Sequence, residues 1–198
     1  ALSSWKNTNP QTRFDILDNI GRIILTRQDE LGEILAREEG KTLSEAKGEA
    51  FRAGQFFQFY AAEALRRTGE QNLSTRPNID VEIVREPIGV TVLITPWNFP
   101  IAIPAWKIAP ALAHGNTVVL KPSEITPASA YHLTKIMEEA GLPAGVFNLL
   151  VAKGEAVGGT LVSHPAVAGI SFTGSVPTGR KIAQGAIQHM KKIQMEMG

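Results

Sequence analysis

The residues best suited to chemistry follow apolar, strand-like segments of the chain. The stretch TPWNFP places the carboxamide of Asn98 between two aromatic rings and encloses all three residues with prolines. Asn98 is therefore either a turn former or a hydrogen-bond donor that is held still. Glu196 stands near the end of an apolar strand, where it is either a solvated edge charge or a general base. The other strand ends carry such residues too, which favours the role of a base.

The stretch FTGSVPTGRK has the composition of a phosphate-binding helix start. Gly174 and Gly179 enclose Ser175 at a place where free backbone N–H groups can meet an anion. A P-loop needs Lys and then Ser or Thr after the second glycine, but Arg180 and Lys181 follow here, so a triphosphate loop is excluded. No Gly-x-Gly occurs in the chain, so a glycine-opened helix and a phosphate site remain equal alternatives.

The stretch KPSE follows another buried strand. Pro122 restricts the backbone of Lys121, whose side chain is placed to reach a ribose or a phosphate. Glu124 is placed to accept hydrogen bonds from ribose hydroxyls. Taken alone, each is as well explained as a solvated loop charge.

The composition limits the classes of function. The chain has 198 residues, 43% of them hydrophobic, with 20 Lys and Arg against 19 Asp and Glu, as expected of a soluble globular protein. The basic pair Lys191-Lys192 is predicted to be a solvated strand entrance and not part of a basic surface, so no nucleic-acid partner is expected. No apolar run approaches the ~20 residues that span a bilayer. We expect no membrane partner and a cytoplasmic location.

Cysteine is absent, and the four histidines are widely separated. The chain therefore offers neither a disulfide nor a thiol nucleophile, and we expect no metal site.

The elements that must position these residues are of two kinds. Helices fill the first third: one opens at Asn9-Pro10, a second ends at Gly40, and a third runs from the capping box of Thr42 and Glu45 to Gly69. The aromatic stripe of the third helix, Phe56, Phe57, Phe59 and Tyr60, is predicted to pack in the core.

The segment 69–80 is predicted to be a linker, and 79–88 alternates apolar and charged residues as an edge or subunit-pairing strand does. From residue 89 onward, five apolar strands alternate with four amphipathic helices, which predicts an α/β, doubly wound parallel sheet. The expected domains are 1–78 (N-terminal helices), 79–88 (bridging strand) and 89–198 (Rossmann-like cofactor domain).

The motifs TPWNFP, Trp106-Lys107, KPSE, FTGSVPTG and MEMG occur in an order and spacing that resemble those of the aldehyde dehydrogenase superfamily. The resemblance covers essentially the whole chain. It implies oxidation of an aldehyde to a carboxylic acid with NAD or NADP, on a Rossmann-like domain that lacks Gly-x-Gly. The residues that the resemblance places at the cofactor are Ile94, Thr95, Pro96, Trp97, Lys121, Ser123, Glu124, Gly154, Gly158, Phe172, Thr173, Gly174, Ser175, Thr178, Met197 and Gly198.

The resemblance also implies a mechanism. Asn98 would donate a hydrogen bond to the oxyanion that forms when a cysteine attacks the aldehyde, and Glu196 would activate the water that hydrolyses the thioester. Lys107 would relay protons to Glu196, and Trp106 would contact the substrate. Glu124 would repel a 2′-phosphate, so NAD is favoured over NADP, although Lys121 and Ser123 would tolerate NADP.

The family's cysteine lies beyond the glutamate motif, and this chain ends two residues after Glu196. We therefore expect a fragment without its catalytic domain, inactive alone, whose full-length form is a homodimer or homotetramer. The alternatives are a non-catalytic dinucleotide-binding or subunit-interaction module, and a reductase of acyl phosphates or thioesters with the same fold.

Overall fold

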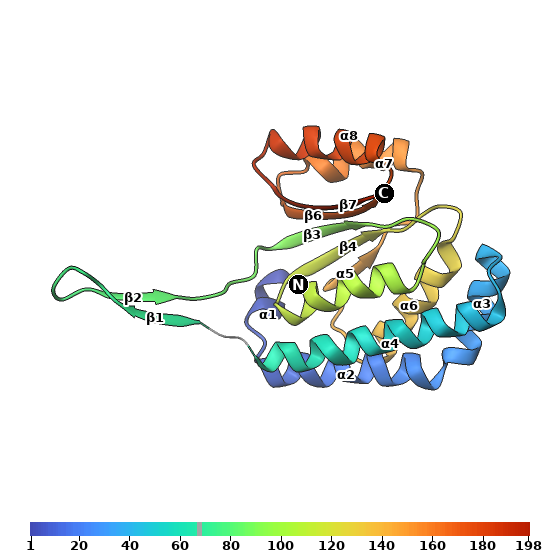
Figure 1. Cartoon of the computed structure of the whole chain (residues 1–198), viewed down its shortest axis with the longest axis horizontal. Helices are drawn as coiled ribbons and strands as arrows, with labels where there is room; N and C mark the ends of the chain where they lie inside the picture. The colour runs from blue at the N-terminus through green and yellow to red at the C-terminus, as the bar shows by residue number, and fades with distance from the viewer. Residues whose placement is uncertain (67–68) are drawn as a thin grey trace.

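The computed structural model describes residues 1–66 and 69–198, and its centre is a five-stranded parallel sheet (Figure 1). The strand order is β5-β4-β3-β6-β7. The strands are β3 (Val90–Ile94), β4 (Thr117–Lys121), β5 (Phe147–Leu149), β6 (Val167–Gly174) and β7 (Lys192–Met197). The chain passes outward from β3 to β5 and then returns to place β6 on the other side of β3. Ligand crevices in open α/β sheets form where the strand order reverses in this way.

Helices cover both faces of this sheet (Figure 1). One face carries α5 (Ala102–Ala113) and α6 (Pro127–Glu139), and the other carries α7 (Gly154–Ser163) and α8 (Val176–Ile187). Buried residues form two clusters: the larger one joins α5, α6 and the N-terminal helices, and the smaller one joins β6, α7 and α8. The predicted α/β, doubly wound fold is confirmed.

The N-terminal section consists of α1 (Leu2–Lys6), α2 (Pro10–Thr26), α3 (Gln28–Glu39) and α4 (Leu43–Leu65). The predicted helix starts are confirmed, because the Asn9 side chain accepts a 2.8 Å hydrogen bond from the Thr12 N–H and Thr42 forms a capping box with Glu45. Helix α4 ends at Leu65 rather than at the predicted Gly69. Helix α1 was not predicted; it buries Trp5, whose indole N–H donates to the Leu112 carbonyl at 3.2 Å.

Glycines set the separation of α2 and α4. A Cβ atom on Gly21 would lie 2.9 Å from the carbonyl oxygen of Gly54 and 2.7 Å from Cγ of Gln58. A Cβ atom on Gly54 would lie 2.7 Å from Cγ of Leu25. The two backbones therefore approach to a distance that a side chain at either position would prevent.

The aromatic stripe of α4 does not behave as one core surface. Phe57 is fully buried, but Phe59 is 57% exposed, so the prediction of core packing is wrong for Phe59. Phe56 stacks on Trp106 of α5 with ring centroids 5.4 Å apart. Tyr60 faces the cavity in which Trp106 also lies. The stripe thus supports one wall of the candidate site.

A two-stranded antiparallel ribbon, β1 (Glu70–Leu73) and β2 (Asp80–Ile83), extends away from the body of the protein (Figure 1). The prediction that 69–80 is a linker is therefore wrong, since β1 pairs with β2 from Glu70 opposite Ile83 to Leu73 opposite Asp80. Both strands are exposed along their whole length. Without a buried face, β1 lacks the alternating pattern by which a strand is recognised in a sequence.

The basic pair at the start of β7 is also more structured than predicted. The Lys191 ammonium group donates hydrogen bonds to the carbonyl oxygens of His164 and Val167, the latter at 2.7 Å, so this side chain ties the loop before β6 to the loop before β7. Lys192 is exposed, as expected of a strand entrance. Among the described residues, no helix is both long and apolar enough to span a membrane.

Candidate active site

The register of the sheet brings the predicted cofactor residues to one edge. Ile94 at the end of β3 pairs with Lys121 of β4 on one side and with Phe172 of β6 on the other. Gly174 at the end of β6 pairs with Met197 of β7. Because the strands are parallel, the segments that follow them emerge at the same edge, beside the starts of the helices.

Lys121 and Glu124 form an ion pair at this edge. The Lys121 side chain is buried, and its Nζ lies 2.9 Å from Oε2 of Glu124, whose side chain is 43% exposed. The hydrogen bond from Lys121 lowers the pKa of the Glu124 carboxyl. Gly154 begins α7 next to this pair, since a Cβ atom there would lie 3.9 Å from Nζ of Lys121. The edge thus presents an ammonium group and an anionic carboxylate side by side.

Helix α8 begins without a side-chain cap. Ser175 occupies the N-cap position, but its hydroxyl oxygen accepts no hydrogen bond from a backbone N–H of the helix; the hydroxyl instead donates to the Thr178 hydroxyl at 3.0 Å. The glycines on either side have a packing reason. A Cβ atom on Gly179 would lie 2.2 Å from Sδ of Met197, and one on Gly174 would lie 2.7 Å from Cζ of Phe172. The glycines let the ends of β6 and β7 pack against the start of α8, whose first N–H groups are not capped by Ser175.

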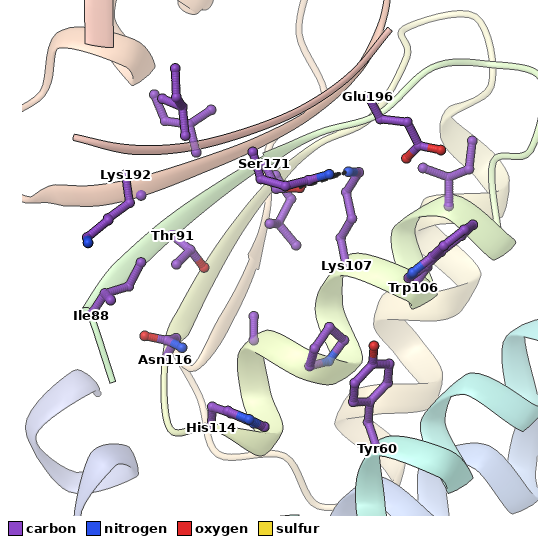
Figure 2. Close-up of a pocket in the computed structure, with 18 residues that line it drawn as sticks. Tyr60, Ile88, Thr91, Trp106, Lys107, His114, Asn116, Ser171, Lys192 and Glu196 are labelled. Atoms are coloured by element: carbon purple, nitrogen blue, oxygen red, sulfur yellow. Dashed lines mark hydrogen bonds between the residues drawn. The ribbon is translucent and has the colours of Figure 1, made fainter. Parts of the chain in front are cut away.

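A cavity of about 550 Å³ lies between α5 and the strands β3, β6 and β7, and it is lined by Lys107, Trp106 and Glu196 (Figure 2). The Lys107 ammonium group donates to the Ser171 hydroxyl at 2.8 Å and to Oε1 of Gln194 at 3.3 Å. Glu196 is exposed, and its Oε2 accepts a 3.0 Å hydrogen bond from the Thr173 hydroxyl. The predicted base, relay and substrate residues therefore share one cavity.

Burial lowers the pKa of Lys107, and the negative charge of Glu196 opposes part of this effect. Lys107 extends from α5 toward the strands, and Glu196 projects from β7 on the same side, so the two charged groups face the same cavity (Figure 2). A lysine in such surroundings gives up its proton more readily than a solvated one, as a proton relay requires.

Asn98 lies in a second cavity, of about 630 Å³, together with Trp97 and Phe99 of the turn between β3 and α5. All three side chains are exposed, and the backbone carbonyl of Asn98 accepts a 2.8 Å hydrogen bond from Lys41 of the segment before α4. Asn98 and Glu196 therefore line two different cavities in the part of the chain that the structure describes, and α5 contributes residues to both.

The remaining predicted cofactor residues vary in their surroundings. Thr95 is buried, its N–H donates to the Lys121 carbonyl at 3.2 Å, and its hydroxyl has no partner within the described chain. The Ser123 hydroxyl accepts from the Ile125 N–H at 3.4 Å. Pro96 follows Thr95 in the turn, and Gly158 lies in α7 with open space around it. Gly198 follows β7 and is exposed.

A model of the aldehyde dehydrogenase family matches residues 1–198. The chain belongs to this family. It is 43% identical to an alpha-ketoglutarate semialdehyde dehydrogenase of Haloferax volcanii, over all of this chain and 41% of that one. The crystal structure of an E. coli NADP-dependent enzyme matches with a TM-score of 0.99 at 40% identity, over 100% of this chain and 41% of that one. A betaine aldehyde dehydrogenase of Staphylococcus aureus in complex with NAD⁺ matches with a TM-score of 0.97 at 36% identity, over 100% and 40%.

This aldehyde dehydrogenase chain thus spans about two fifths of the length of the relatives it matches. The match confirms the family that the order and spacing of the motifs indicated.

The sequence reasoning missed two pairs of residues that contact the predicted site. Ser171 and Gln194 are opposite each other in β6 and β7 and hold Lys107. The available signal was a polar residue in the otherwise apolar strand VAGISF. Lys41 and Glu49 contact the Asn98 turn from the N-terminal helices, and no local pattern marks residues whose partners lie about fifty positions away.

Proposed function

We propose that this chain is the cofactor-binding part of an NAD(P)-dependent aldehyde dehydrogenase that oxidises an aldehyde to a carboxylic acid. The observation that carries the proposal is that the Lys121–Glu124 pair, the start of α8 and Glu196 all lie at the same edge of the sheet. Family membership and the NAD⁺ complex of a structural relative support it.

The residues at the edge suit a dinucleotide. Lys121 and Glu124 offer a donor and an acceptor for ribose hydroxyls, and the N–H groups that begin α8 suit a pyrophosphate. The unpartnered Thr95 hydroxyl supplies a further polar group at the same edge. The anionic Glu124 favours NAD over NADP, since it repels a 2′-phosphate. When bound, NAD(P)⁺ supplies the hydride acceptor for the reaction.

Three side chains of this chain would act on the substrate. Asn98 donates a hydrogen bond to the oxyanion, and one such donor stabilises the transition state by about 3 kcal/mol. Glu196 takes a proton from the water that releases the acid, and Lys107 serves as the relay that returns it to solvent. The nucleophilic cysteine belongs to the rest of the polypeptide in this proposal, because the 198 residues contain none.

The cofactor site is tested by titrating the chain with NADH and following the fluorescence of the dihydronicotinamide. Lys121→Ala removes a charged hydrogen-bond donor, which contributes roughly 1.5–3 kcal/mol, so the dissociation constant rises about 10- to 100-fold. The matched control is Lys135→Ala, which removes a lysine of an exposed ion pair with Glu138 on α6. Equal affinities of the two variants would contradict the proposed site.

The role of Glu196 is tested in the full-length protein with Glu196→Gln. Loss of the base slows release of the acid by a factor of 10²–10⁴ but leaves NAD binding unchanged. An unchanged rate of acid release would remove Glu196 from the mechanism and would favour a reductase of acyl phosphates or thioesters.

We propose further that the ribbon of β1 and β2 joins copies of the full-length protein. Its side chains Leu73, Val81 and Ile83 are apolar and exposed, and exposed apolar strands pair readily with another chain. Sedimentation of Val81→Lys against the unmodified protein tests this: the variant is expected to shift toward the monomer.

A further inference from the structure

The turn that carries Asn98 is held by an ion pair from the N-terminal helices. Nζ of Lys41 donates to the backbone carbonyl of Asn98 at 2.8 Å and to Oε2 of Glu49 at 2.6 Å. The other carboxylate oxygen of Glu49, Oε1, accepts from the N–H groups of Ile101 at 2.9 Å and Ala102 at 3.0 Å. The pair therefore forms hydrogen bonds with the backbone at Asn98 and again three to four residues later.

This pair is shielded from water. The Glu49 side chain is 1% exposed and the Lys41 side chain is 11% exposed. Nζ of Lys41 also lies 4.2 Å from the centre of the Phe99 ring and 3.7 Å from Oε2 of Glu39. Hydrogen bonds between charged groups are stronger than neutral ones, and a buried pair whose groups are all satisfied fixes one geometry.

Glu49 takes the place of a local helix cap. Ile101 is the N-cap residue of α5, and its own side chain forms no capping bond. The carboxylate of Glu49 instead satisfies the N–H groups that begin the helix, as an N-cap oxygen does. The first turn of α5, and with it the preceding turn, is thus anchored to α4 and not to its own sequence.

We propose that Lys41 and Glu49 are positioning residues for the Asn98 carboxamide. They hold the backbone at Asn98 and three to four residues after it, so that the side-chain N–H₂ group is held ready for the oxyanion and does not reorganise during the reaction. The inference rests on the proposed role of Asn98. A group misplaced by about 1 Å can cost a hundredfold in rate, so the pair is expected to matter for catalysis without touching the substrate.

The test is a double-mutant cycle in the full-length protein with Lys41→Met, Asn98→Ala and both together. The measurement is the rate of the first turnover, read from the appearance of NADH. Lys41→Met is expected to slow this rate about 10- to 100-fold in the presence of Asn98, and less than about threefold in the Asn98→Ala background, because a side chain that is gone needs no positioning. The KM for NAD is expected to stay the same.

Two further variants separate positioning from general stability. Lys47→Met removes a lysine from α4 that pairs with Asp29 at 2.9 Å and is remote from the Asn98 turn in its contacts, so it is the matched control and leaves the rate unchanged. Lys41→Arg keeps a positive charge and donors within reach of the same oxygens and is expected to recover most of the rate. Circular dichroism and the thermal midpoint show whether each variant is folded.

The outcomes decide between the two proposals. If the effects of Lys41→Met and Asn98→Ala multiply, the lysine acts independently of the carboxamide and the positioning role is overturned. A normal rate in Lys41→Met also overturns it, while leaving Asn98 as the donor. If Asn98→Ala itself keeps the full rate, both the donor and its positioning residues are refuted. If Lys41→Met unfolds, Glu49→Gln takes its place, because it keeps the oxygen that caps α5 and loses only the charge that holds Lys41.

Discussion

The close approach of α2 and α4 makes a quantitative prediction for Gly21→Ala. An alanine in a helix interior is favoured over glycine by about 0.8–1 kcal/mol, so the change would stabilise an isolated helix. In this structure the new Cβ would lie 2.9 Å from the Gly54 carbonyl oxygen, and backbone has to move to relieve that contact. Overpacking of this kind costs roughly 1–3 kcal/mol.

A matched variant isolates the packing cost. Gly48→Ala lies on α4, where an added Cβ meets nothing within 4 Å, so only the gain in helix propensity is expected. The difference between the two variants is therefore the overpacking cost alone, about 1–3 kcal/mol. For a chain of this size that corresponds to a difference of roughly 2–12 °C in thermal midpoint, with Gly21→Ala lower.

Urea unfolding followed by circular dichroism, together with thermal melts of both variants, provides the assay. The reasoning fails if Gly21→Ala is as stable as Gly48→Ala, because the glycine would then not set the helix separation. The result also concerns the site, since α4 carries Glu49 and the aromatic side chains that support Trp106.

Three further predictions concern charges. Replacing Glu196 by Gln removes the negative charge that opposes the effect of burial, so the pKa of Lys107 falls further, as a titration of lysine Nζ by NMR would show. Glu124→Gln removes the carboxylate that repels a 2′-phosphate, so affinity for NADPH rises relative to that for NADH in fluorescence titrations. Glu38→Ala removes the carboxylate that accepts from the first N–H groups of α6, so the free energy of unfolding falls by about 0.5–2 kcal/mol in urea.

Each of these predictions has a result that contradicts it. An unchanged or higher pKa of Lys107 in Glu196→Gln would mean that the two groups do not interact through the cavity. An unchanged preference between NADPH and NADH would place the 2′ position away from Glu124. For Glu38→Ala the control is Glu33→Ala, an exposed residue on the same helix, and equal stability of the two would show that α6 does not need the distant cap.

The sequence predicts what depends on local pattern. The α/β alternation, the capping of Asn9 and Thr42, and the residues after each strand are all visible over short windows, and the structure confirms the fold that they indicate. Parallel register then brings Lys121, Phe172 and Met197 to one edge without further information. The fold and much of the candidate edge therefore follow from short-range chemistry.

Other features depend on partners far away in the chain. The strand Glu70–Leu73 is polar and exposed and becomes a strand only because β2 pairs with it. Phe57 and Phe59 are two positions apart, and the packing of α4 decides which is buried. Glu49 is an ordinary helical glutamate in the sequence, and its role appears only when α5 is placed against it. The sequence marks Asn98 as part of a motif, but it does not show that Asn98 and Glu196 line different cavities.

Glutamates that are far away in the sequence cap α5 and α6, so the helix starts at this edge of the sheet differ in their charge. A helix start carries a partial charge of roughly +0.5, which a carboxylate neutralises. Glu49 serves α5 and Glu38 serves α6, whereas in residues 1–66 and 69–198 no side chain caps α7 or α8. Glu155 lies in the first turn of α7, whereas the first turn of α8 has no acidic residue, so the start of α8 beside β6 keeps its positive potential. An anionic group that approaches this edge of the sheet is therefore attracted more strongly to the start of α8 than to the starts of α5 and α6, which carboxylates of the N-terminal helices neutralise.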